Sequence, residues 1–481
     1  MPDVKAALAA LRAARPDYDL ARKMYDGQVD EVLLNARLRR LFADSGRSFK
    51  INYARTPVDV MVERTVVQGI TASTPSAQTV LDQNWADNEL GIEAKDGHRR
   101  AYEFGDAFLI AWPDTTDDGT PTGTVTAYMH DPTEVRVFYD PQSPRRKSHA
   151  VHHWLEVGTE DNGLKAGTWD RVDLYYPDRV ECWVSTDPAV DSTGRKRSIP
   201  DDKVEWREYD DGQGWPLDNP TPDVIPVFHF RTLRPYGRPE HADAYGPQNM
   251  ITKLAVSLMG AVDRQVLPQQ YALLEGTRDT APPPAAQLFE DDNPMDPERQ
   301  TGPTRDDLGD QPGDTWLLEG VKSAGQFDPA SLDGFLSAMG ALVEHMADVC
   351  DLPSDRFRRS GQQASAASKR ADEAPLRAKV ADRQAQFGVV WREYLAYVLL
   401  VAGVDGEAEV AWAPPETYND TESWQAALLQ LDAGVPFAQV MRERGYPTDV
   451  VAKWEADLPD GVPPAQAEPG GAVSVGVPEA G

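Results

Sequence analysis

Two stretches of the chain predict long helices: ITKLAVSLMGAVDRQV at residues 251–266 and DPASLDGFLSAMGALVEHMADV at residues 328–349. In the first stretch, apolar residues recur at helical spacing: Ile251, Leu254, Leu258, Val262 and Val266. Pro268 follows and should bend or end this helix, since proline lacks the backbone N–H that continues one. In the second stretch Asp328 and Pro329 form a helix start, with a capping carboxylate and a proline in the first turn.

The apolar residues of the second helix repeat every 3.5 residues or so, a spacing suited to packing against other helices. They are Leu332, Phe335, Met339, Leu342, Met346 and Val349. Between the two helices lies an insertion rich in proline and acidic residues. Its acidic residues include Asp291, Asp292, Asp296, Asp306, Asp307, Asp310 and Asp314. Two amphipathic helices that flank such an insertion cannot easily form a core of their own, but they would pack well against copies of themselves in a ring.

Upstream, the pattern is that of a sheet. The first 115 residues are mostly helical in pattern, with a short strand at 107–112, and residues 122–231 then alternate apolar and polar side chains with period two. The predicted strands are 124–128, 134–139, 150–157, 171–176, 180–185, 204–209 and 225–230. Because no helices intervene, the sheet should be antiparallel or mixed, and the fold class is α+β.

Downstream, a polar connector at 351–363 carries Arg356, Arg358 and Arg359. A third long helical pattern covers 364–401, and Pro375 inside it predicts a kink. A short strand at 409–412 and compact helices over 420–457 follow. The tail, 459–481, is rich in Pro, Gly and Ala and is expected to be disordered.

Composition limits the function classes. The 481 residues are 41% apolar and 26% charged, which is ordinary for a globular chain of two or three domains. With 48 basic and 78 acidic residues the formal charge is −30, which argues against a sequence-specific DNA binder. No apolar run approaches the length of a membrane span, and the N-terminus lacks the pattern of a secretory signal. Cys182 and Cys350 are the two cysteines, which suggests reduced thiols in the cytoplasm.

Catalytic and metal sites find little support in the sequence. There is no Gly-x-x-x-x-Gly-Lys-Ser/Thr loop, so ATP binding of that kind is not expected. His149, His152 and His153 raise the question of a metal site, but strand alternation puts His152 and His153 on opposite faces, which favours ordinary strand histidines. The twelve tryptophans and many carboxylates would suit a glycosidase cleft, yet nothing locates the pair of carboxylates that such an enzyme needs.

Short signatures along the chain resemble the portal proteins of tailed phages, in particular the siphophage type. In order they are Tyr18; Tyr25-Asp26-Gly27; Phe49-Lys50-Ile51-Asn52-Tyr53; Val62-Glu63-Arg64 before Gly69; Trp85, Asn88 and Leu90; Glu103-Phe104-Gly105-Asp106-Ala107-Phe108; Tyr139-Asp140-Pro141; and Tyr236-Gly237-Arg238-Pro239-Glu240. None is specific alone, and the match lies in their order over nearly the whole chain. Pro239 departs from the serine that related chains often carry.

The resemblance implies a dodecameric ring at one vertex of the virion head, assembled in the host cytoplasm. The regions it implies are a wing (1–246), a first stem helix (247–275), a clip (276–318), a second stem helix (319–350), a tunnel loop (351–363), a kinked long helix with a return to the wing (364–415), a crown (416–458) and the tail. The residues that would pack between the stem helices are Leu254, Leu258, Val262, Phe335, Met339 and Leu342. The acidic residues of the clip would form the docking surface for tail or packaging proteins.

The same resemblance implies a conduit for double-stranded DNA without enzymatic activity, cofactor or bound metal. Its partners would be further copies of the chain, the terminase large subunit, a head-completion adaptor, and the major capsid and scaffolding proteins. Arg356, Arg358 and Arg359 would either touch DNA phosphates or form salt bridges within a solvated loop. Alternatives to the portal reading are another phage head protein, such as a capsid or minor head component, and a glycan hydrolase.

Overall fold

The computed structural model describes residues 2–28, 51–116, 121–159, 162–200, 203–210, 214–266, 270–274, 321–326, 332–357, 371–415, 420–444, 446 and 448–457. The chain forms two compact units. The first contains Met1–Val29, Lys50–Tyr245 and Met346–Gly481, and the second contains Asp30–Phe49 and Gly246–His345.

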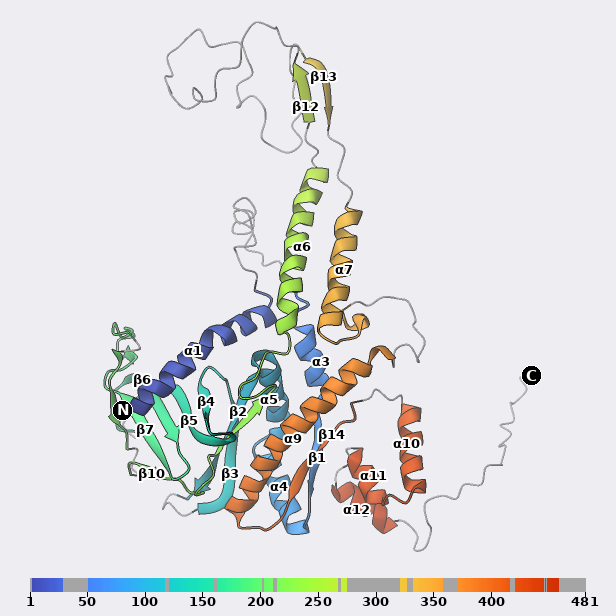
Figure 1. Ribbon diagram of the computed structural model, residues 1–481. Coiled ribbons are helices and arrows are strands. Elements are labelled where there is room, and N and C mark those ends of the chain that lie inside the picture. The colour runs from blue at the N-terminus through green and yellow to red at the C-terminus, as the bar shows by residue number, and fades with distance from the viewer. Residues whose placement is uncertain are drawn as a thin grey trace, which may run out of the picture. The chain divides into compact units, whose positions relative to one another are not determined.

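The largest element of the first unit is a seven-stranded antiparallel sheet with the order β10-β7-β6-β5-β4, in which β8 pairs with β6 and β9 with β7 (Figure 1). Its strands are β4 (Val135–Asp140), β5 (Ser143–Val157), β6 (Gly167–Tyr175), β7 (Arg179–Ser185), β8 (Val190–Asp191), β9 (Trp206–Glu208) and β10 (Leu217–Asp218). Each strand predicted between 134 and 209 is present. Among the described residues, the strand pairings of this sheet are all antiparallel, which agrees with the predicted antiparallel or mixed sheet.

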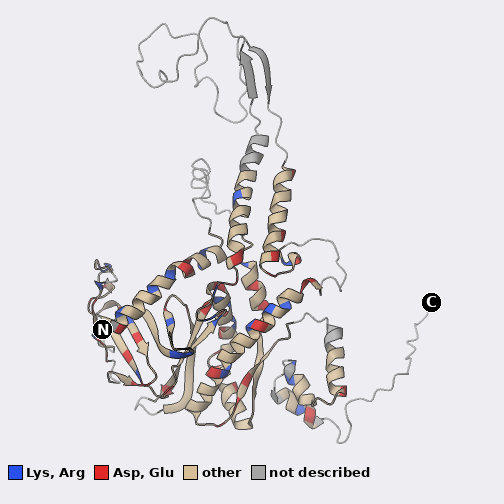
Figure 2. Ribbon diagram, viewed as in Figure 1, with Lys and Arg blue, Asp and Glu red and all other residues tan. Residues whose placement is uncertain are grey.

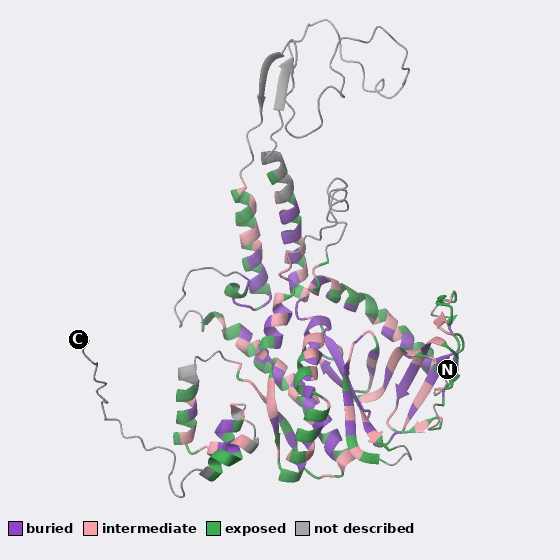
Figure 3. Cartoon of the chain, turned by 180° about the vertical axis from the view of Figure 1, so that it is seen from behind, coloured by how far each residue is buried: buried purple, intermediate pink, exposed green. Residues whose placement is uncertain are grey.

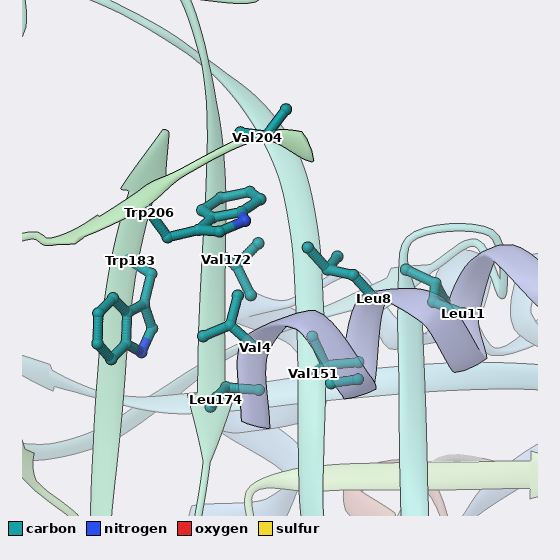
Figure 4. Packing of buried hydrophobic residues seen from close by; sticks show 10 residues of the cluster. Val4, Leu8, Leu11, Val151, Val172, Leu174, Trp183, Val204 and Trp206 are labelled. Carbon is teal, nitrogen blue, oxygen red and sulfur yellow. The ribbon is translucent and has the colours of Figure 1, made fainter. Parts of the chain in front are cut away.

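The N-terminal helix α1 (Pro2–Tyr25) packs on this sheet. Figure 4 shows Val4, Leu8 and Leu11 on the face of α1 that meets the strands. The strand side of this cluster consists of Val151, Val172, Leu174, Trp183, Val204 and Trp206. The spacing of three and four residues along α1 produces this contact, because it places all three side chains on one helix face.

A second, three-stranded sheet has the order β11-β2-β3 and packs between the first sheet and helices (Figure 1). Its strands are β2 (Asp106–Thr115), β3 (Pro121–His130) and β11 (Val227–Arg231). On one face Phe108 and Val227 pack with Val137 of the large sheet. On the other face Phe228 and Phe230 meet aromatic rings of α9 (Ala374–Ala402). Successive side chains of β11 point to opposite faces of the sheet, so this strand contributes residues to two separate hydrophobic cores.

Helices and a strand pair complete this unit. The helices are α3 (Thr56–Arg64), α4 (Pro75–Asp87) and α5 (Leu90–Phe104), and the pair is β1 (Val67–Ala72) with β14 (Ala408–Trp412). The compact helices predicted near the C-terminus are α10 (Asp420–Asp432), α11 (Phe437–Glu443) and α12 (Thr448–Asp457). They share a small core that includes Ala427, Val440 and Val451.

Two predicted features differ in detail. Pro375 lies in the first turn of α9, where its missing N–H costs no helical hydrogen bond. Residues 371 and 372 are helical and Glu373 interrupts the helix, so the break precedes the proline. Residues 270–274 and 321–326, which fall within the regions 247–275 and 319–350 but outside the helices that the apolar spacing predicts, form the antiparallel strand pair β12 (Gln270–Leu274) and β13 (Val321–Gln326).

The second unit contains this strand pair and the two long helices, α6 (Tyr245–Val266) and most of α7 (Asp333–Val349). The helices end and begin close to the bounds that the apolar spacing predicts. The paired strands β12 and β13 follow α6 and precede α7 along the chain. The α+β class predicted from the sequence is confirmed. Within the described part of the chain, no helix is long and apolar enough to cross a membrane.

One buried histidine, His98 of α5, connects three elements of the first unit. Its Nδ1 lies 3.1 Å from the carbonyl oxygen of Thr65, and its Nε2 lies 3.0 Å from Nε1 of Trp391 in α9. Indole N–H only donates, so Nε2 is the acceptor and Nδ1 carries the proton. Burial lowers the pKa of His98 to about 4, because a charged imidazole cannot be solvated there.

Protonation of His98 by acid should therefore destabilise the first unit. Between about pH 6.5 and pH 4 the unfolded chain binds a proton at His98 that the folded chain does not, so the free energy of unfolding falls as the pH falls. A shift of this size corresponds to roughly 3 kcal/mol. Urea unfolding midpoints measured from pH 7 to pH 4 test this, and His98→Gln should show a weaker pH dependence. A midpoint that stays constant over this range would contradict it.

Candidate functional regions

Asp106, the first residue of β2, is the centre of a buried network formed by several of the sequence signatures. It is 1% exposed. Its carboxylate accepts hydrogen bonds from the Tyr18 hydroxyl (2.9 Å), His229 Nε2 (2.8 Å) and the backbone N–H of Gly237 (2.7 Å). Burial alone would raise the pKa of Asp106, but these hydrogen bonds outweigh it and hold that pKa below its usual value. Because the other ring nitrogen of His229 lies 2.8 Å from the Tyr139 hydroxyl, residues far apart in sequence are held together here.

Two glycines make the network possible. Gly105 has a φ of +91°, which favours glycine, and it lies against Gly237. A Cβ on Gly237 would lie 1.7 Å from the carbonyl oxygen of Gly105, so the two backbones are in contact. The Thr232 hydroxyl donates to the Arg238 carbonyl at 2.6 Å, and the N–H of Arg238 donates to that hydroxyl at 3.0 Å. The Gly105-Asp106 and Tyr236-Gly237 signatures are thus two sides of one junction.

Glu240, in the same signature as Gly237, ties the segment that leads to α6 to other elements. Its side chain is 3% exposed and pairs with Lys379 (2.6 Å) and Arg383 (3.2 Å), both on α9. Its backbone N–H donates to the carbonyl of Tyr102 in α5 at 2.8 Å. A buried carboxylate with two cationic partners is held in one geometry, because separation would leave a buried charge unpaired. The chain is therefore anchored five residues before α6 begins.

The predicted stem-packing residues of α6 are only partly covered in the single chain. Leu254 and Leu258 are half-buried and Val262 is 37% exposed, whereas the buried residues of this helix include Ile251 and Ala255. On α7 the predicted residues Phe335, Met339 and Leu342 are all half-buried.

The N-terminal part of α7 is the more exposed one. Leu336 is 57% exposed, whereas Val343, Met346 and Ala347 are buried (Figure 3). Asp333, Glu344 and Asp348 are its charged residues, and it carries no lysine or arginine (Figure 2). The helix thus offers apolar and acidic side chains to its surroundings.

The connector after α7 is described as far as Phe357. Leu352, Pro353 and Phe357 are buried, and a short 3-10 turn, η5 (Ser354–Arg356), lies between them. Arg356 extends toward Glu63 (3.7 Å) and Glu373 (3.9 Å) with its side chain 31% exposed. Such long, exposed ion pairs contribute little to stability. Arg356 was expected either to touch DNA phosphates or to form salt bridges, and in the single chain it lies near two carboxylates.

The other predicted site residues lie outside the described residues. These are Arg358 and Arg359 of the connector and Asp291, Asp292, Asp296, Asp306, Asp307 and Asp310 of the clip, and the C-terminal tail lies outside them too. Asp106 and Glu240, by contrast, were quoted in the signatures but given no role. The signal that could have singled out Asp106 is an acidic residue directly before the apolar pair Ala107 and Phe108, since buried carboxylates need partners. No such signal marks Glu240, which follows Arg238 and Pro239.

Comparisons with known proteins agree with these signatures. No protein-family model matches the chain. The chain is 26% identical over 418 residues to the portal protein of Mycobacterium phage D29, which covers 82% of this chain and 76% of that protein. It is also 26% identical over 415 residues to the portal protein of Mycobacterium phage L5, with the same coverage.

Solved structures give weaker matches. A structure of the neck of a native gene transfer agent particle, computed with C12 symmetry, aligns over 82% of this chain and 91% of the other, with 13% identity and a TM-score of 0.41. A virion of such a particle aligns over 79% and 84%, with 11% identity and a TM-score of 0.37. The match with the two mycobacteriophage proteins confirms the resemblance that the ordered signatures indicate: this chain is similar to phage portal proteins over most of its length.

Proposed function

We propose that this chain is the subunit of a portal, a closed ring of about twelve copies at one vertex of a phage head through which double-stranded DNA is packaged and later ejected. The observation that carries the proposal is sequence similarity to two portal proteins over 82% of the chain. The role is structural: the ring guides DNA and performs no chemical step. The virion is its final location, after assembly in the host cytoplasm.

The surface of α7 supports ring formation. An apolar helix needs a partner surface, yet Leu336 is mostly exposed, and Phe335, Met339 and Leu342 are only half-buried in the single chain. Neighbouring copies of α6 and α7 would cover these side chains, together with Leu254, Leu258 and Val262. A heterologous contact of this kind repeats from copy to copy and closes into a ring when the rotation between copies allows it.

Native mass spectrometry of the purified chain tests ring formation directly. We expect a species near twelve copies of the 53.0 kDa subunit, with a minority of neighbouring stoichiometries. A protein that stays monomeric or dimeric at high concentration, with its helices folded, would contradict the proposal. A glycan hydrolase would instead show turnover on a polysaccharide.

Charge suits a conduit through which DNA slides. Twelve copies at −30 each give a formal charge near −360. Each phosphate that a basic side chain neutralises releases counterions and strengthens binding, so a basic lining would hold DNA in place. Acidic walls avoid this, and salt screens the repulsion beyond about 8 Å. Contacts with DNA would then fall to a few basic side chains, and we assign them to Arg356, Arg358 and Arg359.

Replacing these three arginines by alanine should preserve rings and lower the amount of DNA packaged or retained per head. Among the described residues, Arg356 forms long ion pairs with Glu63 and Glu373, so its loss should not unfold the connector. DNA per head and infectivity are the measurements. The matched control is Arg145→Ala with Arg146→Ala, two exposed residues at the start of β5. Lys147 is left unchanged, because it pairs with Glu393 at 2.9 Å. Normal packaging by the triple variant with a defect in the control would refute the assignment.

The acidic clip supports docking of other proteins. Asp291, Asp292, Asp296, Asp306, Asp307 and Asp310 would present negative charge to a basic surface, which speeds and orients association. The partners that we propose are the terminase large subunit during packaging and a head-completion adaptor afterwards, while the ring contacts major capsid and scaffolding proteins in the head. A chain without residues 285–312 should bind neither the terminase nor the adaptor, and unchanged binding to both would remove the clip assignment.

A further inference from the structure

Three potential metal ligands converge where the two sheets of the first unit meet. His130 is the last residue of β3, Glu134 lies in the turn that follows, and His152 lies in β5. One ligand atom from each side chain lies within 4.8 Å of the other two. The two histidines come from different sheets, because β3 belongs to the three-stranded sheet and β5 to the seven-stranded one.

The turn that carries Glu134 is fixed by its own hydrogen bonds. The carboxylate of Asp131 accepts from the N–H and the hydroxyl of Thr133, at 3.0 and 2.8 Å, and pairs with Arg22 of α1. The N–H of His153 donates to the carbonyl oxygen of Glu134 at 2.8 Å, which places Glu134 beside the strand that carries His152. A rigid backbone of this kind suits a ligand site, since little order must be gained on binding.

The imidazole rings are also positioned. The ring of His152 stacks on Trp154 with centroids 4.2 Å apart, and the rings of His130 and His152 meet edge to face at 4.5 Å. Within the described part of the chain, no hydrogen-bond or ion-pair partner is found for the His130 ring, the His152 ring or the Glu134 carboxylate. By contrast, neighbouring His153 is paired with Asp170 at 3.0 Å. Two half-buried imidazoles and an exposed carboxylate, gathered at one point without partners, are groups that a bound ion would satisfy.

Charge at the cluster is compatible with a cation. Burial lowers the pKa values of His130 and His152, so both rings are neutral near pH 7, and neutral imidazole is the form that binds metal. Arg100 adds positive charge nearby, and its guanidinium donates to the carbonyl of Met129. Glu134 supplies a carboxylate to the cluster, and burial together with the nearby charge of Asp131 raises its pKa.

We propose that His130, Glu134 and His152 bind one Zn²⁺ ion, which connects the three-stranded sheet to the seven-stranded sheet. Two imidazoles and a carboxylate are a donor set for Zn²⁺, whereas Mg²⁺ and Ca²⁺ prefer oxygen ligands alone. Ligand atoms around a tetrahedral Zn²⁺ lie roughly 3.4 Å apart, given bonds of about 2.1 Å. The exposed Glu134 side chain has room to close that gap. Water would complete the fourth position.

Sequence reasoning missed this site because it compared histidines along one strand. His152 was weighed with His149 and His153, whereas its partners are His130, 22 positions earlier, and Glu134 in a turn. Antiparallel pairing of β4 with β5 sets Val135 opposite His152, and this register brings Glu134 into reach. The pairing is a tertiary fact that spacing within β5 does not reveal.

Titration of the full chain with Zn²⁺ tests the proposal, after dialysis against a chelator. Calorimetry should show one ion per chain, and Co²⁺ in its place should give the visible absorption of a four-coordinate site. His130→Gln and His152→Gln should each weaken Zn²⁺ binding by about 100-fold or more, because loss of even an outer partner costs 10–100-fold. Zn²⁺ should also raise the melting temperature of the wild-type chain but not of these variants.

Two further variants keep the test decisive. Glu134→Gln changes an exposed side chain, so in the presence of chelator this variant should be as stable as the wild type. Its affinity for Zn²⁺ should nevertheless be lower than that of the wild type. His149→Gln is the matched control, because His149 lies on the same strand but stacks on Phe138, outside the cluster. It should bind Zn²⁺ like the wild type. A wild-type chain that binds no Zn²⁺, equal binding by Glu134→Gln, or loss of binding only in His149→Gln would each overturn the proposal.

Discussion

Replacing Leu336 by aspartate is expected to leave the chain folded and to prevent it from forming rings. Leu336 is 57% exposed on α7, so a carboxylate there is solvated in the single chain and costs the fold little. In a ring, the same position would be covered by a neighbouring copy. The interface would lose about 2 kcal/mol of apolar burial and would also hold an unpaired carboxylate away from water. A loss of about 4 kcal/mol weakens each contact by roughly 1000-fold.

A closed ring amplifies this effect, because it contains as many such contacts as subunits. Native mass spectrometry and negative-stain microscopy of the purified variant are the measurements, with circular dichroism to verify its helices. Ser337→Asp is the matched control: it adds the same charge at the next position, also exposed, without removing an apolar side chain. Normal rings from Leu336→Asp would show that α7 is not covered at this position. If neither Leu336→Asp nor Ser337→Asp forms rings, the added negative charge, not the loss of an apolar side chain, is the cause.

The largest expected loss of stability follows from replacing Gly237 by alanine. The added Cβ would lie 1.7 Å from the carbonyl oxygen of Gly105, and backbone cannot move aside as a flexible side chain can. The junction would open and Asp106 would lose the N–H of Gly237, which leaves a buried carboxylate with fewer donors. We expect a destabilisation of at least about 4 kcal/mol, and an apparent melting temperature lower by roughly 5 °C or more.

Gly91→Ala provides the control for this substitution. Gly91 lies in the first turn of α5, and a Cβ there would meet only the Trp85 indole nitrogen, at an ordinary 3.9 Å. Alanine in a helix is favoured over glycine by about 0.5–1 kcal/mol, so this variant should melt at or slightly above the wild-type temperature. Scanning calorimetry compares the two. If Gly237→Ala melts with the wild type, the close approach of the two backbones does not constrain the fold.

What the sequence by itself determined is the local structure. Strands β4 to β7 follow from alternation of apolar residues, and α6 and α7 follow from apolar residues three and four apart, because both periods are set by neighbours on one element. The family resemblance also needed only the sequence, since its signatures are short motifs in a fixed order. The strand pair at 270–274 and 321–326 was not predicted, because a five- or six-residue stretch carries too little periodicity and the pairing of β12 with β13 supplies the hydrogen bonds that decide it.

Only the tertiary structure decided which residues meet. Asp106 receives hydrogen bonds from Tyr18, His229 and Gly237, which are 88, 123 and 131 positions away. Likewise, His130 faces His152 because two sheets pack together, and Pro375 lies in the first turn of a helix because the preceding helical residues are interrupted at Glu373. The physical reason is the same in each case. A buried polar group takes whichever partner the folded backbone delivers, and neither residue type nor spacing along the chain specifies a partner a hundred positions away.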